Sequence, residues 1–204
     1  MTVKNNHPFW KRAAVAAFGC LILGIGIGIC EHAQLGTDPM TVLLVGLHNH
    51  MPAVSLGEIN IVLSLIQIAI AFFLDASTIS IVTFIAMIAI SAGIDLAVWL
   101  NLGPAVLPWN LVWLLLGILV YSLGGALSQY PQCGYSPYDV LIFGIQKHTG
   151  GKYHTIRWAV DLTYLGSGWL LGGVAGIGTV LILLLTGKLI EWWLKQITRI
   201  AQKR

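Results

Sequence analysis

Apolar segments about as long as a bilayer is thick follow one another along the whole chain, with only short polar breaks between them. A helix needs about 20 apolar residues to cross the hydrocarbon core of a membrane. Charged residues make up only 9% of the 204 residues, whereas soluble domains carry roughly 25%. The pattern predicts an all-α polytopic membrane protein without a soluble catalytic domain. Its six predicted full-length spans are residues 13–33, 56–74, 78–100, 109–128, 155–171 and 179–197.

Two further apolar segments, residues 39–47 and 137–146, are too short to span a bilayer. A helix of ~10 residues reaches roughly 15 Å, which is half the hydrocarbon core. Each segment is therefore either a re-entrant half-helix or a tilted span that its flanking residues extend. We favour the re-entrant interpretation.

The two short segments also align with each other, residues 36–50 with 134–148, without a gap. Glycine, proline, valine, leucine, glycine and histidine recur in the same order. The chain is therefore interpreted as two homologous halves, each with three spans and one short helix. The same register pairs Gly19 with Gly117, Gly26 with Gly124 and Gln34 with Gln132. The predicted division is an N-terminus at 1–12, repeats at 13–100 and 109–197, a linker at 101–108 and a C-terminus at 198–204.

Basic residues indicate how the halves face, because lysine and arginine beside spans mark the cytoplasmic side. They precede the first span and follow the last, so both termini are predicted to be cytoplasmic. If the short helices cross the membrane the repeats are parallel, and if they are re-entrant the repeats are inverted. The loop at 48–52 has no lysine or arginine, whereas the loop after the second short helix has Lys147 and Lys152. This asymmetry favours inverted repeats.

Several short motifs resemble those of a bacterial membrane protein family, the YczE/YyaS/YitT group. The resemblance covers nearly the whole chain. It implies a multi-pass protein of the bacterial cytoplasmic (inner) membrane, of a kind often taken to be a transporter. The motifs are Gly36-x-Asp38-Pro39, Ser55-x-Gly57 and Gly176-Ile-Gly178-Thr179, with Gly187 ahead of an acidic helix.

Each short helix is expected to begin at a Gly-x-x-Pro motif. Proline at the first helical position loses no hydrogen bond, and an N-cap side chain belongs immediately before it. One interpretation is simply a well-capped helix start. The other is a discontinuous helix whose N-terminal amides face a solute near mid-membrane, with the glycine lining that site. The residues concerned are Gly36, Asp38 and Pro39 in the first half, and Gly134, Ser136 and Pro137 in the second.

Ionisable residues inside apolar stretches are a second indication of function, because each costs ~2.5–3.5 kcal/mol at a helix centre. Glu58, Asp139 and Asp161 are predicted to lie deepest. Arg157 and Asp161 are four residues apart and can pair on one helical face, either as a structural ion pair or as part of a site. Asn60 continues the helical face of Glu58, as interhelical glue or as a cavity wall.

Other classes of function find little support. The three cysteines, Cys20, Cys30 and Cys133, form no CxxC pair, and the histidine pair His48 and His50 lacks a third ligand. No catalytic signature or basic nucleic-acid surface appears, so neither an enzyme, a cofactor, a metal site nor nucleic-acid binding is expected.

The sequence therefore predicts a secondary transporter with its site between the halves. Acidic residues outnumber basic ones there, so the solute is expected to be cationic, or neutral and moved with a proton. The alternative is a membrane accessory or assembly protein whose polar groups only hold helices together. The expected partners are the lipid bilayer and the small solute, with a homodimer left open. The predicted site residues are Gly36, Asp38, Pro39, Glu58, Asn60, Gly134, Ser136, Pro137, Asp139, Arg157 and Asp161.

Overall fold

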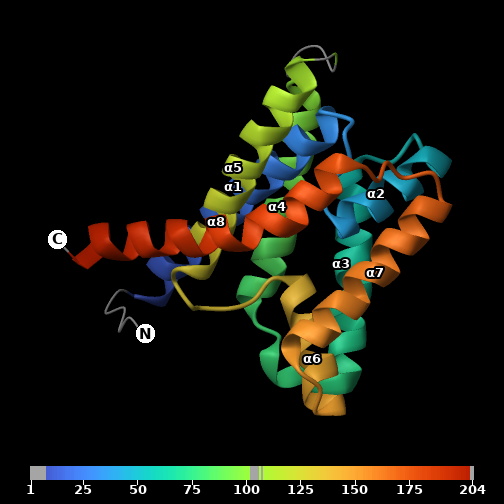
Figure 1. Cartoon of the computed structure of the whole chain (residues 1–204). Coiled ribbons are helices and arrows are strands. Elements are labelled where there is room, and N and C mark those ends of the chain that lie inside the picture. Colours follow the sequence, from blue (N-terminus) through green and yellow to red (C-terminus); the bar gives the residue numbers. More distant parts are fainter. Residues whose placement is uncertain (1–7, 102–105, 107, 203–204) are drawn as a thin grey trace.

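Helices make up most of the part of the chain that the computed structural model describes, which is residues 8–101, 106 and 108–202 (Figure 1). A short 3-10 turn, η1 (Ala76–Thr78), connects the third helix to the fourth. The predicted all-α membrane fold is confirmed, while most of the predicted linker at 101–108 lies outside the described residues. The helices are α1 (Phe9–His32), α2 (Pro39–His50), α3 (Leu56–Asp75), α4 (Ile81–Trp99), α5 (Trp109–Gln129), α6 (Pro137–Thr149), α7 (Tyr153–Leu170) and α8 (Ile177–Gln202).

Each of the six predicted spans corresponds to one long helix, and five of these are long and apolar enough to cross a membrane. The exception is α7, whose 18 residues include His154, Arg157 and Asp161 in its first half. The short helices α2 and α6 have 12 and 13 residues, so they reach only about 18–20 Å at 1.5 Å per residue. They remain too short to cross on their own.

The first helices of the two halves, α1 and α5, pack against each other at glycine residues. Glycine permits this because a side chain at these positions would collide with the facing helix. Residue numbers rise along α1 as they fall along α5, so the two helices are antiparallel. The facing pairs are Gly19 with Ser128, Leu23 with Gly124, Gly26 with Tyr121 and Cys30 with Gly117.

The remaining contacts follow a matching pattern in the two halves. Helix α1 packs against α4, and α5 packs against α8. Each short helix packs on a long helix from the opposite half of the sequence, α2 on α7 and α6 on α3 (Figure 1). Glycine allows close approach at both contacts. A Cβ on Gly46 would lie 2.7 Å from the Gly168 carbonyl oxygen, and one on Gly144 would lie 3.4 Å from the Ala71 Cα.

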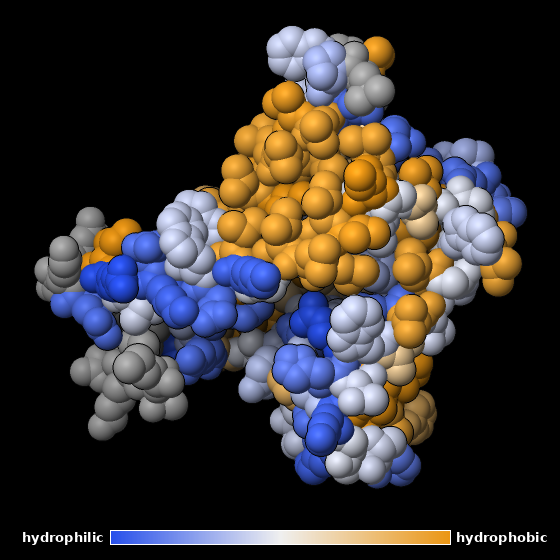
Figure 2. Space-filling model, in the orientation of Figure 1, coloured by the Kyte–Doolittle hydropathy of each residue, from blue (hydrophilic) through white to orange (hydrophobic). Residues whose placement is uncertain are grey.

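The surface is apolar where helices face outward, and polar side chains lie inside. Figure 2 shows hydrophobic residues over α5 and the first half of α8, and hydrophilic residues along the C-terminal half of α8. Leu119 and Leu184 are 46% and 63% exposed, whereas the polar side chains of Asn60 and Gln67 are 4% and 2% exposed. This distribution suits a chain whose solvent is lipid.

Candidate functional site

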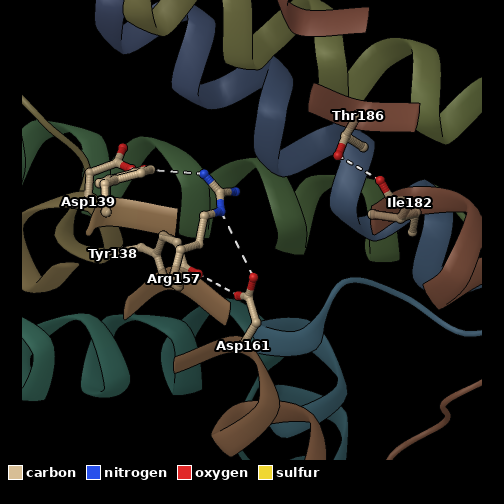
Figure 3. A network of polar contacts seen from close by, with 7 residues as sticks. Tyr138, Asp139, Arg157, Asp161, Ile182 and Thr186 are labelled. Atoms are coloured by element: carbon tan, nitrogen blue, oxygen red, sulfur yellow. Dashed lines mark hydrogen bonds and ion pairs between the residues drawn. The ribbon is translucent and has the colours of Figure 1, made fainter. Parts of the chain in front are cut away.

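A network of polar side chains connects the start of α6 to the first half of α7 (Figure 3). It consists of Tyr138, Asp139, Tyr153, Arg157 and Asp161, and we refer to these five residues as the Arg157 cluster. Arg157 Nη1 donates to the Tyr153 hydroxyl at 3.3 Å, and that hydroxyl donates to Asp139 Oδ1 at 3.5 Å. The Tyr138 hydroxyl donates to Asp161 Oδ1. The cluster thus joins two acids, two tyrosines and one guanidinium.

Arg157 makes two further contacts in the cluster. Its Nε lies 3.9 Å from Asp161 Oδ2, so the ion pair predicted from the four-residue spacing is confirmed. Its guanidinium carbon lies 5.6 Å from the centre of the Tyr138 ring, within the range of a cation–π interaction. Arg157 is therefore held by one carboxylate, one hydroxyl and one aromatic face.

Local capping explains why α6 begins where it does. Ser136 Oγ accepts a hydrogen bond from the Asp139 amide at 3.2 Å and donates to the Asp139 carboxylate at 2.8 Å. Pro137 follows as the first helical residue. The predicted serine cap is confirmed, and it places Asp139 in the first turn, facing back towards the chain that enters the helix.

The start of α2 is capped in the same way by an acidic residue. Asp38 accepts hydrogen bonds from the Thr41 amide at 3.2 Å and from the Thr41 hydroxyl at 2.6 Å. Pro39 is again the first helical residue. The predicted Asp38 cap is confirmed.

Gln67 on α3 connects the Arg157 cluster to the start of α2. Its Nε2 donates to the Tyr164 hydroxyl at 2.9 Å and to the Met40 sulfur at 3.6 Å. The Tyr164 ring lies 6.3 Å from that of Tyr138. Residues from α2, α3, α6 and α7 therefore meet in one polar region, and both short helices begin there.

Two buried oxygens beside this region have no hydrogen-bond partner, Thr37 Oγ1 and Gln67 Oε1. Their side chains are only 4% and 2% exposed. A buried acceptor without a partner costs about 1–3 kcal/mol. Both oxygens are enclosed, so they mark a polar region whose hydrogen bonding is incomplete.

The two motif glycines serve packing rather than lining the site, which corrects the sequence-based expectation. Gly36 has a positive φ of 97°, and a Cβ there would lie 2.7 Å from the Thr179 hydroxyl. A Cβ on Gly134 would lie 2.6 Å from the Val82 Cβ and 2.7 Å from Ser80 Oγ. Each glycine is needed where its loop approaches a helix start in the opposite half.

We expect Gly134→Leu to destabilise the folded protein rather than to block a ligand selectively. The new side chain would collide with Val82 at the start of α4, and overpacking of this kind typically costs about 1–3 kcal/mol. Gly166→Leu on α7 is the matched control, because nothing lies within 4 Å of a Cβ there. Thermal unfolding of the purified variants measures the difference, and equal melting temperatures would contradict this role of Gly134.

Glu58 and Asn60 lie outside the Arg157 cluster. Glu58 was predicted to lie deep, but it is exposed in the first turn of α3, where it forms a capping box with Ser55. Asn60 Nδ2 donates to Ser91 Oγ at 2.8 Å and joins α3 to α4. Gln67, which does reach the cluster, lies nine residues further along α3, about 14 Å from Glu58 by helical rise. Glu58 and Asn60 therefore have structural roles.

A cavity of about 330 Å³ opens beside the cluster, at the end of α3. An ion pair at 2.9 Å between Lys147 and Asp75 lies in its wall. Phe143 also lines it, and its ring lies 5.5 Å from that of Tyr153 in the Arg157 cluster. One aromatic ring thus lies between this open cavity and the polar network.

The chain matches the model of a known protein family over residues 10–195. That family is described as a family of unknown function, DUF6198. The chain belongs to DUF6198. No solved structure matches it.

Three bacterial relatives support the assignment to DUF6198. An uncharacterized protein of Haemophilus influenzae is 28% identical over 194 residues, which cover 94% of this chain and 87% of that protein. The uncharacterized membrane protein YczE of Bacillus subtilis is 24% identical over 87% of this chain and 83% of its own length. YyaS of the same organism is 26% identical over 89% and 91%. The family resemblance inferred from the motifs is confirmed.

Proposed function

We propose that this DUF6198 protein is a secondary transporter of a small organic solute, with its site at the Arg157 cluster. The solute is cationic, or neutral and moved together with a proton. The protein works in the cytoplasmic membrane of a bacterium, with both termini in the cytoplasm. The loop charges and the apolar surface support this location.

We also propose that the two halves form an inverted repeat, because many secondary carriers are built from two halves of opposite orientation. Helices α1 and α5 are equivalent in the predicted register, and they pack antiparallel through Gly26 and Gly124. Contacts between the two halves also come in equivalent pairs. Asn49 at the end of α2 donates to the Gly172 carbonyl at 2.9 Å. Lys147, which the register aligns with Asn49, forms an ion pair with Asp75 near the end of α6. A pseudo-two-fold axis in the membrane plane accounts for both observations.

The observation that carries the proposal is the charge balance where both short helices begin. Asp38, Asp139 and Asp161 lie there, and among the described residues these carboxylates form one ion pair, that of Asp161 with Arg157. Charged groups inside a membrane are expensive unless compensated. A surplus of acid is therefore suited to bind a cation or to take up protons, and both are ways of coupling a solute to ion movement.

Uptake by proteoliposomes tests this function directly. A thermal-shift screen of the purified protein against amines, amino acids and vitamins identifies a stabilising solute, and its radiolabelled form is then offered to the vesicles. We expect Asp161→Asn to lower uptake about tenfold or more, which corresponds to 1.4 kcal/mol. Glu191→Gln is the matched control, because that carboxylate lies on the surface of α8, paired with Lys195. Equal uptake by vesicles with and without the protein would overturn transport and favour the accessory role.

The inverted repeat makes a separate prediction about topology. In a background without Cys20, Cys30 and Cys133, a cysteine at position 49 should react with an impermeant thiol reagent from outside intact cells. A cysteine at position 149 should react only after the cells are opened. Asn49 and Thr149 are both exposed at the ends of the short helices. Labelling of both from the same side would contradict the inversion and support parallel repeats.

A further inference from the structure

We propose that the Arg157 guanidinium occupies a cation site in this conformation, and that the solute carries a guanidinium or primary amine group that takes its place. This inference rests on the proposed transport function and names the chemical class of the solute. Arg157 then acts as a tethered competitor, which fills the site when the solute is absent.

The surroundings of Arg157 are those that recognise an organic cation. They comprise the Asp161 carboxylate at 3.9 Å, the Tyr153 hydroxyl at 3.3 Å and the face of the Tyr138 ring at 5.6 Å. Aromatic faces next to carboxylates bind ammonium and guanidinium groups through cation–π attraction and charge. A free guanidinium or amine meets the same set of ligands when Arg157 withdraws.

Arg157 is held loosely enough to be displaced. Its separation of 3.9 Å from Asp161 is longer than the 2.7–2.9 Å of a close charge-assisted hydrogen bond. The Arg157 side chain is 47% exposed, whereas that of Asp161 is 17% exposed. The carboxylate is thus fixed inside, while the guanidinium reaches it from the edge. Withdrawal of the side chain opens the acidic site without moving its ligands.

The unpartnered oxygens of Thr37 and Gln67 point independently to a ligand. Both accept hydrogen bonds, and both are at least nine-tenths buried. Gln67 reaches the cluster through Tyr164, and Thr37 directly precedes Asp38. Both oxygens are enclosed in this conformation, so N–H groups elsewhere on the solute satisfy them only once neighbouring side chains have moved.

The test is chemical rescue of the full-length Arg157→Ala protein, purified in detergent with methylguanidinium as the probe. At about ten times its dissociation constant, the probe should raise the melting temperature of the variant by roughly 3–5 °C. Urea at the same concentration is the control, since it has nearly the same shape and no charge. Arg157→Ala/Asp161→Asn lacks the carboxylate and should gain no such rise. An equal rise with urea, or no rise with methylguanidinium, overturns the cation site.

A second measurement uses the wild-type protein, so it does not depend on the folding of a variant. Phenylglyoxal modifies exposed arginines, and peptide mass spectrometry reports each site. Methylammonium serves as the probe here, because phenylglyoxal also reacts with free guanidinium groups. It should increase modification of Arg157 while leaving Arg199 on α8 unchanged, because a displaced guanidinium moves into solvent. Unchanged or reduced modification of Arg157 contradicts displacement. Rescue and displacement without uptake of any solute by proteoliposomes would retain the site and remove transport, whereas uptake without either effect would do the reverse.

Discussion

Gly26→Leu is expected to abolish the packed helical core. A Cβ at this position on α1 would meet the backbone nitrogen of Tyr121 on α5, and backbone atoms cannot move aside as a flexible side chain can. Such a collision between two central helices should cost more than about 4 kcal/mol, in the range reserved for severe core defects. Loss of the monodisperse peak in size-exclusion chromatography and loss of a cooperative melting transition measure the effect.

Gly187→Leu is the matched control for that substitution. It makes the same change within a membrane helix, but at an exposed position on α8 where nothing lies within 4 Å of the new Cβ. Gly124→Leu, at the equivalent position on α5, should resemble Gly26→Leu because its Cβ would meet the backbone of Leu23. If Gly26→Leu melts like Gly187→Leu, α1 and α5 are not in close contact in the membrane.

Arg157→Met is expected to lower the stability of the folded protein by about 1–2 kcal/mol. Removal of one partner of a buried ion pair typically costs about 3–5 kcal/mol, because the other charge is left uncompensated, whereas an exposed pair contributes less than about 1 kcal/mol. The pair of Arg157 and Asp161 lies between these cases, because Asp161 is mostly buried and Arg157 is half-exposed. The loss is expected to exceed that of Asp161→Asn, since Arg157→Met leaves three carboxylates without a cation whereas Asp161→Asn leaves two carboxylates with one.

The double variant Arg157→Met/Asp161→Asn provides the internal control. It removes both members of the pair, so it should recover part of the stability that Arg157→Met loses. Thermal unfolding at neutral pH compares the four proteins under one condition. A double variant that melts no higher than Arg157→Met would mean that Arg157 and Asp161 do not compensate each other.

Local features of the fold could be predicted from the sequence because neighbouring residues determine them. Asp38 and Ser136 act as N-caps, since a cap needs only the next turn of helix. The predicted register also paired Gln34 with Gln132, and both adopt an unusual left-handed conformation, with φ of 54° and 49°. The two positions that the sequence register pairs thus share a rare backbone conformation, so the aligned sequences also constrain the local geometry.

The composition of the site could not be predicted as readily, because its contacts join distant residues. Gln67 and Tyr164 are 97 residues apart and meet only because α6 and α7 pack against α3 and α2. The tyrosines at 138, 153 and 164 were missed for this reason. Glu58 is different, because Ser55-x-x-Glu58 is itself a capping-box signature. That signal was available in the sequence, and it explains why Glu58 lies in the first turn of α3.

The packing of each short helix on a helix of the opposite half has a mechanical consequence. Since α2 packs on α7 and α6 packs on α3, neither half of the sequence is a separate solid body. A hinge at the linker alone cannot swing one half away from the other without pulling each short helix off its support. In the proposed transport cycle, the contacts favour the crossed pairs, α2 with α7 and α3 with α6, as the units that shift against each other beside the antiparallel helices α1 and α5. Any opening towards one side of the membrane then moves parts of both halves at once.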